Sequence, residues 1–262
     1  MRKVINPIIR ILGSLFGMII IANIFLFADK EPYFCKKTFL CSNKMMLLIG
    51  LFLVVICCLI VGKNTLFPLL EKMKVNHLLI ASLILLFFQL WIAWNIYFEA
   101  GWDCWAIVDT ARSFVEGSLR NGSYYGTYPN NIVLMGIFSI ILKGAAFIGV
   151  EHGYFVLIIC NVILLNLSGL MTASITYHMT LNKKIVAIVW ISFSILGSLS
   201  GWMVVPYSDV WALFFVILTF YLYGMIREKH TWIPWVIVGI LFFIGAQIKP
   251  TTLIGLIAIV MA

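Results

Sequence analysis

Residues 99–131 read EAGWDCWAIVDTARSFVEGSLRNGSYYGTYPNN, and they form the longest polar interruption in a chain of 262 residues that is 63% hydrophobic. This stretch holds four of the ten acidic residues of the chain. Charged side chains are costly in lipid and loops lie where water is, so carboxylates and aromatic rings between long apolar runs mark the natural place for chemistry. We interpret the rest of the chain mainly as a membrane scaffold.

The composition is that of a multi-pass membrane protein. Charged residues make up 11% of the chain and the mean hydropathy is +1.08, whereas soluble domains hold about 25% charged residues. Because backbone polar groups in lipid must bond within their own segment, we predict an all-α bundle of membrane-spanning helices. We expect this bundle to lie in the plasma membrane. The net charge of +8 is spread over short loops, which indicates topology signals and contacts with lipid headgroups and argues against a nucleic-acid partner.

Apolar runs of about the length that crosses a bilayer divide the chain. Two of them, at 8–27 and 45–61, form a predicted N-terminal addition within residues 1–76, and residues 77–262 form the predicted core. The runs of the core are 77–98, 132–150, 154–177, 185–205, 210–226, 232–248 and a last one that starts at Thr251. That last run stops at Ala262 after twelve residues, too few to cross a bilayer, so we expect a longer protein.

The segment 132–150 decides the topology, because a crossing there would reverse the side of every later loop. If it lies in the interface instead, the basic loops around Lys183 and Arg227 share a side with the basic N-terminus, which is the positive-inside arrangement. Eight of the ten acidic residues then lie on the other side. We therefore predict an interfacial segment at 132–150 and an extracytoplasmic loop at 99–131.

Apolar residues recur at helical spacing within the loop and predict a short amphipathic helix on the bilayer surface. Its predicted apolar face comprises Cys104, Ile107, Val108, Ala111, Phe114 and Val115, and its polar face Asp109, Arg112, Ser113 and Glu116. Asp103 comes just before this helix, where a carboxylate either caps the first turn or acts as a general base with restricted access to water. The residues alone leave both roles open.

Four motifs in order resemble membrane glycosyltransferases of the GT-C superfamily, of the protein mannosyltransferase and aminoarabinose transferase kind. They are GWDCWAIVDTAR after a predicted span, YYGTYPNN before an apolar segment, PYSDVWALFF at a helix start, and QIKPTTLI. The resemblance covers about residues 80–262 and implies transfer of a sugar from a polyprenyl-phosphate donor to an acceptor outside the cytoplasm. In such enzymes a first-loop Asp, often followed by a second acid, activates the acceptor. Asp103 stands at that position, but Cys104 follows it, so the paired-acid form is absent.

The resemblance and the predicted sidedness together give a candidate site. Asp103 is the expected catalytic base and Asp209 its support, with a helix cap as the alternative for Asp209. Lys249 is expected to pair with the donor phosphate, the alternative being a lysine that reaches from a helix end to the membrane surface. The other expected substrate contacts are Asp109, Tyr124, Tyr125, Tyr128, Asn130 and Asn131. Their alternatives are an interfacial belt for the tyrosines and helix capping for the asparagines.

The sequence predicts no metal site, because the histidines are scattered and the cysteines lack ligand spacing. Asp103 with Asp109 or Asp209 offers oxygen ligands of the kind that Mg²⁺ or Mn²⁺ takes, so metal dependence stays open. Two other classes also stay open. A transporter or lipid flippase is expected to carry ionisable residues near the midplane, with Lys143 as the main candidate. A noncatalytic membrane assembly subunit would use the loop for docking.

Overall fold

The computed structural model describes residues 75–150, 152–226 and 232–255, so the predicted spans at 8–27 and 45–61 lie outside the described residues. Every regular element in the described ranges is helical, which confirms the predicted all-α fold class. The polar stretch forms α5 (Trp102–Val115) and α6 (Gly122–Thr127). The helices around it are α4 (Val75–Ile96), α7 (Asn131–Phe147), α8 (Gly153–Thr180), α9 (Lys183–Phe193), α10 (Ser208–Ile226) and α11 (Ile233–Ile248).

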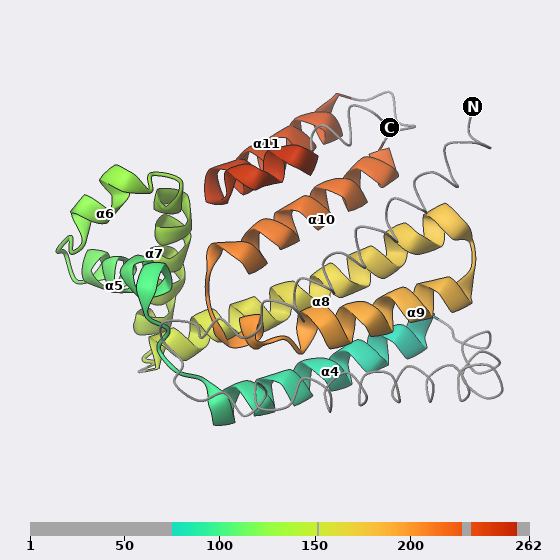
Figure 1. Cartoon of the computed structure of the whole chain (residues 1–262), viewed down its shortest axis with the longest axis horizontal. Coiled ribbons are helices and arrows are strands. Elements are labelled where there is room, and N and C mark those ends of the chain that lie inside the picture. Colours follow the sequence, from blue (N-terminus) through green and yellow to red (C-terminus); the bar gives the residue numbers. More distant parts are fainter. Residues whose placement is uncertain (1–74, 151, 227–231, 256–262) are drawn as a thin grey trace, which may run out of the picture. The chain divides into compact units, whose positions relative to one another are not determined.

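Among the described residues, three helices, α4, α8 and α10, are long and apolar enough to cross a membrane. The central one is α8, which packs against α4, α7, α9 and α10 (Figure 1). It buries Leu157, Ile158 and Val162 completely. In contrast, α4 keeps large apolar side chains such as Phe87 and Trp91 exposed among the described residues, as expected of a helix that meets lipid.

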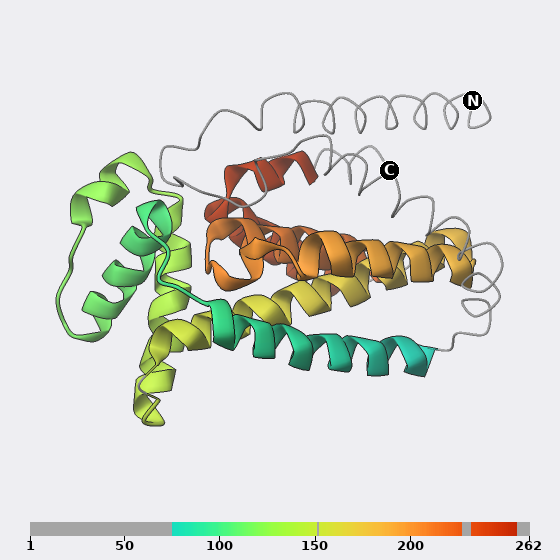
Figure 2. The same cartoon turned by 60° about the horizontal axis from the view of Figure 1, so that its bottom comes forward.

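The helix α7 does not extend the bundle. It has 17 residues and is not among the helices long enough to span. In both Figure 1 and Figure 2 it lies across the end of the bundle where α5 and α6 also gather. At this end, which we call the α7 end, α8 and α10 begin while α4 and α11 stop. This is the arrangement that the interfacial interpretation of residues 132–150 requires.

Local signals fix where several helices begin and end. Gly117 follows α5 with a φ of +80° and Gly149 follows α7 with a φ of +75°, a left-handed conformation that glycine adopts without steric cost. At the start of α9, the Asn182 side-chain oxygen accepts hydrogen bonds from the backbone N–H groups of Lys184 (3.0 Å) and Ile185 (3.4 Å). This cap stabilises the turn between α8 and α9, at the end of the bundle opposite the α7 end.

The prediction of one continuous span at 185–205 is wrong. The α-helix α9 ends at Phe193, and the chain continues as a wide π turn, η2 (Ser194–Ser198), and then as a 3₁₀ turn, η3 (Gly201–Val204). The Phe193 ring lies against Gly169 of α8 and Gly197 of η2, where an added Cβ would come within 3.1 Å and 3.3 Å of it. The stretch SILGSLSG at 194–201 is a sign of the break, since serine and glycine gather at turns and kinks, but the hydrophobicity of the whole run outweighs it in the prediction.

Side-chain amides from α4 and α8 bind the first part of the broken segment. The Gln89 Nε2 atom of α4 donates a hydrogen bond to the Ser198 carbonyl oxygen (2.5 Å). Asn166 Nδ2 of α8 in turn donates to Gln89 Oε1. Gln89 is fully buried and Asn166 is 7% exposed. The two amides therefore satisfy each other and a carbonyl group that the end of η2 leaves open.

A third amide binds the second part of the segment. Asn161 Nδ2 of α8 donates to the carbonyl oxygens of Trp202 (3.1 Å) and Val205 (2.7 Å). Asn161 is fully buried, and carbonyl groups buried without a donor are strongly unfavourable at membrane depth. We call Gln89, Asn161 and Asn166 the amide clamp, because together they hold residues 198–205 in a non-α-helical path.

Replacing Asn161 with leucine would remove both hydrogen bonds at a similar side-chain size. Each carbonyl group left buried without a donor costs about 1–3 kcal/mol, so we expect a clearly lower melting temperature in detergent. Asn95→Leu is the matched control, because Asn95 is exposed and bonds to Trp91 of its own helix. Equal melting temperatures of the two variants would contradict the role of the clamp.

The ends of the bundle can be assigned to sides of the membrane by cysteine labelling. Ser123 in α6 and Asn182 before α9 are partly or fully exposed, and these elements lie at opposite ends. In a variant without the natural cysteines, a membrane-impermeant maleimide added to intact cells should modify a cysteine at Ser123 but not at Asn182. The reason is that Lys183 and Lys184 favour the cytoplasmic side. Modification at both positions would contradict this arrangement.

Candidate functional site

The site lies at the α7 end, where the first turns of α5 and α10 face each other. Tyr207, the residue before α10, donates a hydrogen bond from its hydroxyl to Asp103 Oδ2 of α5 (3.1 Å). The next residue, Cys104, donates from Sγ to the Pro206 carbonyl oxygen (3.3 Å). Two consecutive residues of α5 therefore hold two consecutive residues before α10, and this double contact fixes Asp103 and Tyr207 against each other.

The structure excludes the cap interpretation of Asp103. The residue before α5 is Gly101, no side chain caps the helix, and Asp103 lies inside its first turn. Its carboxylate is bonded across to Tyr207 instead. Trp102, immediately before it, has a φ of +46°, a conformation that costs bulky residues of order 1–3 kcal/mol and occurs where surrounding contacts enforce it. The backbone that carries Asp103 is thus strained into place.

An ion pair joins α10 to the end of α11. Lys249, which directly follows α11, contacts Asp209 Oδ1 through its Nζ atom. Asp209 lies in the first turn of α10, and its carboxylate binds this lysine, so the cap interpretation does not describe it. The side chains of Asp209 and Lys249 are 42% and 32% exposed. Both charges are therefore within reach of solvent or a ligand.

A chain of amides links α6, α7 and α11 beside these residues. Asn131 Nδ2 donates to the Tyr124 hydroxyl oxygen (2.6 Å). Asn130 Nδ2 donates to Asn131 Oδ1 (3.1 Å) and, at 3.4 Å, to the carbonyl oxygen of Ile248, the residue before Lys249. Asn130 precedes α7 without a side-chain cap, so the capping interpretation of this asparagine is wrong. The amides instead tie Tyr124 to the segment that carries Lys249.

The charge of Asp103 acts on both Tyr207 and Tyr124. Burial, followed by the Asp103 charge and its hydrogen bond, raises the pKa of Tyr207 to about 12. Burial and then the Asp103 charge also raise the pKa of Tyr124. Both phenols therefore stay neutral at ordinary pH. We name Asp103, Tyr124, Asn130, Asn131, Tyr207, Asp209 and Lys249 the site cluster; its members come from α5, α6, α7, α10 and the end of α11.

The other two predicted tyrosines line α6 beside the cluster. The ring of Tyr125 meets Tyr124 edge-on with centroids 5.1 Å apart, and Tyr128 meets Tyr124 at 5.0 Å. Tyr128 is 46% exposed. An exposed aromatic surface of this kind fits both a sugar contact and an interfacial belt, so the structure leaves both interpretations in place.

Asp109 is not brought to the cluster. Its carboxylate accepts a hydrogen bond from Asn121 Nδ2 (2.9 Å) and lies 3.5 Å from a guanidinium nitrogen of Arg120, so it holds the connection between α5 and α6. The predicted polar face of α5 is also wrong at Ser113. That residue is fully buried. Its hydroxyl is satisfied there, because it donates to the Thr110 carbonyl oxygen (2.9 Å) and accepts from the Arg120 N–H (3.1 Å).

A second group of contacts anchors the link from α4 to α5. Arg112 binds both carboxylate oxygens of Glu99 (2.6 and 3.3 Å), which holds the pKa of Glu99 below its usual range. The same guanidinium lies 5.8 Å from the centre of the Tyr154 ring. The Tyr154 hydroxyl accepts a hydrogen bond from the backbone N–H of Ala100 (3.1 Å). These contacts position the start of α5.

Sequence reasoning missed Tyr207 and the roles of Cys104 and Tyr154. Tyr207 is part of the quoted PYSD motif. Its position between a proline and two helix-starting residues is the one sequence signal that could have marked it as a site residue. Nothing in the sequence pairs it with Asp103, which is 104 positions away. Long-range side-chain contacts of this kind follow from packing and have no local pattern.

The cluster offers few groups for a metal. Among the described residues no three side chains of His, Cys, Asp or Glu gather in a way that could hold an ion. Asp103 and Asp209 are the carboxylates of the site cluster, and carboxylate oxygens are ligands that Mg²⁺ and Mn²⁺ accept. Asp209 is engaged by Lys249. Asp103 is therefore the residue that would first meet a divalent cation.

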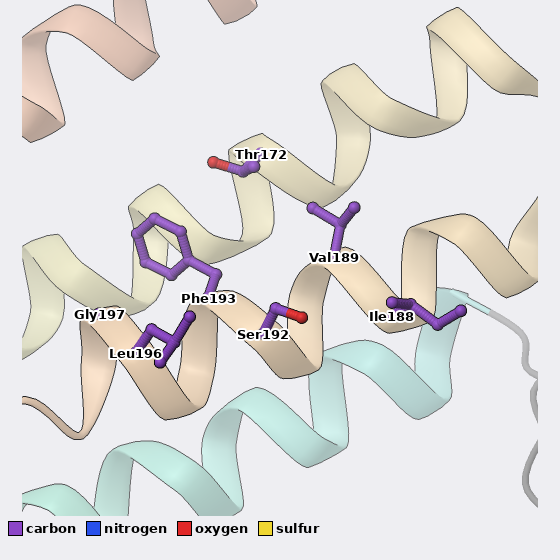
Figure 3. A pocket seen from close by; sticks show the side chains of 7 residues that line it. All are labelled: Thr172, Ile188, Val189, Ser192, Phe193, Leu196 and Gly197. Atoms are coloured by element: carbon purple, nitrogen blue, oxygen red, sulfur yellow. The ribbon is translucent and has the colours of Figure 1, made fainter. Parts of the chain in front are cut away.

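A hollow of about 420 Å³ lies elsewhere, between α8 and the α9–η2 segment (Figure 3). It is lined by Thr172, Ile188, Val189, Ser192, Phe193, Leu196 and Gly197. None of these residues belongs to the site cluster and none is charged. The Thr172 hydroxyl already donates to the Ser168 carbonyl oxygen (2.8 Å). This apolar surface has no group for acid–base chemistry.

Alkaline pH should weaken the contact between α5 and the residues before α10. Burial raises the pKa of the Cys104 thiol from 9.0 to about 12, so an unfolded chain loses this proton first. The protonated thiol stabilises the folded state fully below pH 9, and this contribution is lost as the pH rises towards about 12. Between about pH 8 and pH 11, the melting temperature of the wild type should fall more steeply than that of Cys104→Ser, which keeps a donor for Pro206 and does not titrate there. Parallel curves would contradict this assignment.

Comparison with known proteins defines the family of the chain but no activity. Neither the curated proteins nor the solved structures compared with it gave a match. Over residues 1–262 it matches the family described as "Conserved hypothetical integral membrane protein", in agreement with the helices α4, α8 and α10, which within the described ranges are long enough to cross a membrane. The chain therefore belongs to this family of integral membrane proteins.

Proposed function

We propose that the protein is a multi-pass glycosyltransferase of the plasma membrane that moves a sugar from a polyprenyl-phosphate donor to an acceptor at the extracytoplasmic surface. The observation that carries this proposal is the site cluster. Residues that are far apart in the sequence meet at one end of the bundle, and they include a carboxylate, a lysine and neutral hydrogen-bonding groups. These are the groups that transfer from a glycosyl phosphate needs.

Asp103 is the proposed general base. In the reaction its carboxylate accepts the proton of the acceptor hydroxyl while that oxygen forms a bond to the anomeric carbon of the sugar. The bond between this carbon and the phosphate oxygen breaks, and the phosphate leaves with the electron pair. Tyr207 binds Oδ2 of Asp103 and leaves Oδ1 for the acceptor. The bond to a neutral phenol orients the carboxylate without neutralising its charge.

Lys249 is the proposed partner of the phosphate. An ammonium group next to the phosphate offsets the charge that develops as the phosphate leaves. Asp103 acts electrostatically on Tyr124, the rings of Tyr125 and Tyr128 pack against it, and Asn130 and Asn131 hold Tyr124 in place. This arrangement supports a sugar subsite on the α6 side of Asp103.

The transporter alternative has less support in the described residues. Among Asp, Glu, Lys and Arg, the three candidate spans contain Asp209 alone, in the first turn of α10. Lys143, the residue that would favour transport, lies exposed on α7 at the bundle end. An ion or proton relay is expected to place such groups inside the spans. The noncatalytic alternative is separated by the activity test below.

Asp103→Asn tests the function directly. The amide oxygen of asparagine can still accept the bond from Tyr207, so folding should be preserved, whereas the side chain can no longer take a proton. In the purified full-length protein, we expect transfer from a polyprenyl-phosphate sugar to fall about 10²- to 10⁴-fold. The melting temperature should remain close to that of the wild type.

Two comparisons sharpen this test. Glu116→Gln removes an exposed carboxylate at the other end of α5 and should leave transfer unchanged, and Asp209→Asn should lower turnover less than Asp103→Asn. Wild-type turnover by Asp103→Asn would exclude Asp103 as the base. If the wild type transfers no sugar from any polyprenyl-phosphate donor, the noncatalytic alternative is favoured.

A further inference from the structure

Asp209 binds Lys249, the same lysine that the proposed function assigns to the donor phosphate. Among the described basic residues of the α7 end, Arg112 is bound by Glu99, Arg120 lies near Asp109 and Glu116, and Lys143 lies exposed on α7, all outside the site cluster. Lys249 is the basic residue within the cluster. Any anion drawn to the cluster must therefore meet Lys249 while Asp209 holds it.

The two partners differ in their freedom to move. The backbone of Lys249 is fixed, because its N–H donates to the Gly245 carbonyl oxygen (2.9 Å) and its carbonyl oxygen accepts from the Thr252 N–H (3.0 Å). The preceding residue, Ile248, is fully buried. The long side chain of lysine can still turn about four carbon–carbon bonds, whereas the side chain of Asp209 is short and starts from the first turn of α10. Rotation of the lysine is therefore enough to open the pair.

We propose that Asp209 is a built-in competitor that reserves Lys249 for the phosphate monoester formed when the sugar leaves the donor. The inference rests on the proposed function and adds a selection step to it. The donor is a phosphodiester with one negative charge, whereas the departing polyprenyl phosphate carries up to two negative charges and three acceptor oxygens. The monoester therefore displaces a single carboxylate from the lysine, and the singly charged diester does not. Because partly exposed ion pairs are weak, the competitor is displaced at little cost, and it keeps the lysine neutralised until the bond to the sugar breaks.

This inference predicts an effect opposite in sign to that of an ordinary ligand-binding residue. Asp209→Asn removes the competitor and should tighten the binding of farnesyl phosphate to the purified full-length protein in zwitterionic nanodiscs, by roughly two- to fivefold. Lys249→Gln should weaken that binding by at least about tenfold. Both values can be measured by titration calorimetry, without any turnover.

Glu99→Gln is the matched control, because it also replaces the carboxylate partner of a basic residue at the α7 end by an amide. It changes the net charge by the same amount and should leave the affinity for farnesyl phosphate unchanged. Farnesol should not bind in the same range, and inorganic phosphate should bind more weakly than farnesyl phosphate. If Asp209→Asn lowers the melting temperature strongly, Asp209→Ser, with a residue common at helix starts, replaces it.

The outcomes separate the inference from the function. If Lys249→Gln weakens binding but the Asp209 variants bind no better than the wild type, the competitor is excluded and the phosphate-binding lysine stands. If Glu99→Gln tightens binding as much as Asp209→Asn, the effect is one of net charge and the inference fails. Equal affinity for inorganic phosphate and farnesyl phosphate would exclude a lipid headgroup. If farnesyl phosphate binds to none of the proteins, both the inference and the proposed donor fail.

Discussion

The fold depends on the need to bond backbone carbonyl groups where the chain leaves the α-helical path between α9 and α10. A regular helix would satisfy these groups within its own segment, as membrane-spanning segments must. Here the π turn, the 3₁₀ turn and the stretch up to Tyr207 leave carbonyl groups open, and Gln89 and Asn161 donate to them. The break is stable only because α4 and α8 place amides opposite it.

The site is a consequence of this break. Had residues 185–205 formed one helix, its last turns would replace η3, and Pro206 and Tyr207 would leave the bundle from a different point. The amide clamp instead holds residues 198–205 from the bundle side, and Cys104 holds Pro206 from the α5 side. Tyr207 is left between the two anchors and bonds to Asp103. Packing inside the bundle thus sets the position of a carboxylate at its surface.

Part of this organisation could be predicted from sequence. Long apolar runs predicted α4, α8 and α10 because burial in lipid demands uniform hydrophobicity over a fixed length. The distribution of charge predicts that 132–150 does not cross the membrane, and α7 lies across the end of the bundle. Asp103, Asp209 and Lys249, which were chosen from motifs, lie at that same end. The break after Phe193 was missed because the hydrophobicity of the whole run favours one span, although the serine- and glycine-rich stretch at 194–201 is typical of an interrupted helix.

The remaining failures concern polar residues whose partners are remote. The asparagines before α7 resembled caps, but Asn130 reaches a carbonyl group 118 positions away. Ser113 fell on the polar face by periodicity, but a loop folds over it and uses its hydroxyl. Asp103 resembled a cap as well, because helix starts and active sites favour the same short acidic side chain. Only the three-dimensional partner separates the two roles.

The polar groups inside the bundle and those at the α7 end differ in whether they can carry or exchange charge. Within the described residues, the side chains that bind the open carbonyl groups of residues 198–205 are amides, which hold no exchangeable charge and whose donors are used on the backbone or on each other. Such groups fix a structure but cannot relay a proton or bind and release an ion. The carboxylates and the lysine lie at the α7 end, where Asp209 and Lys249 are partly exposed. This division favours chemistry on a lipid-borne substrate at one membrane surface over passage through the bundle, because movable charge exists at that surface and is absent from the described interior.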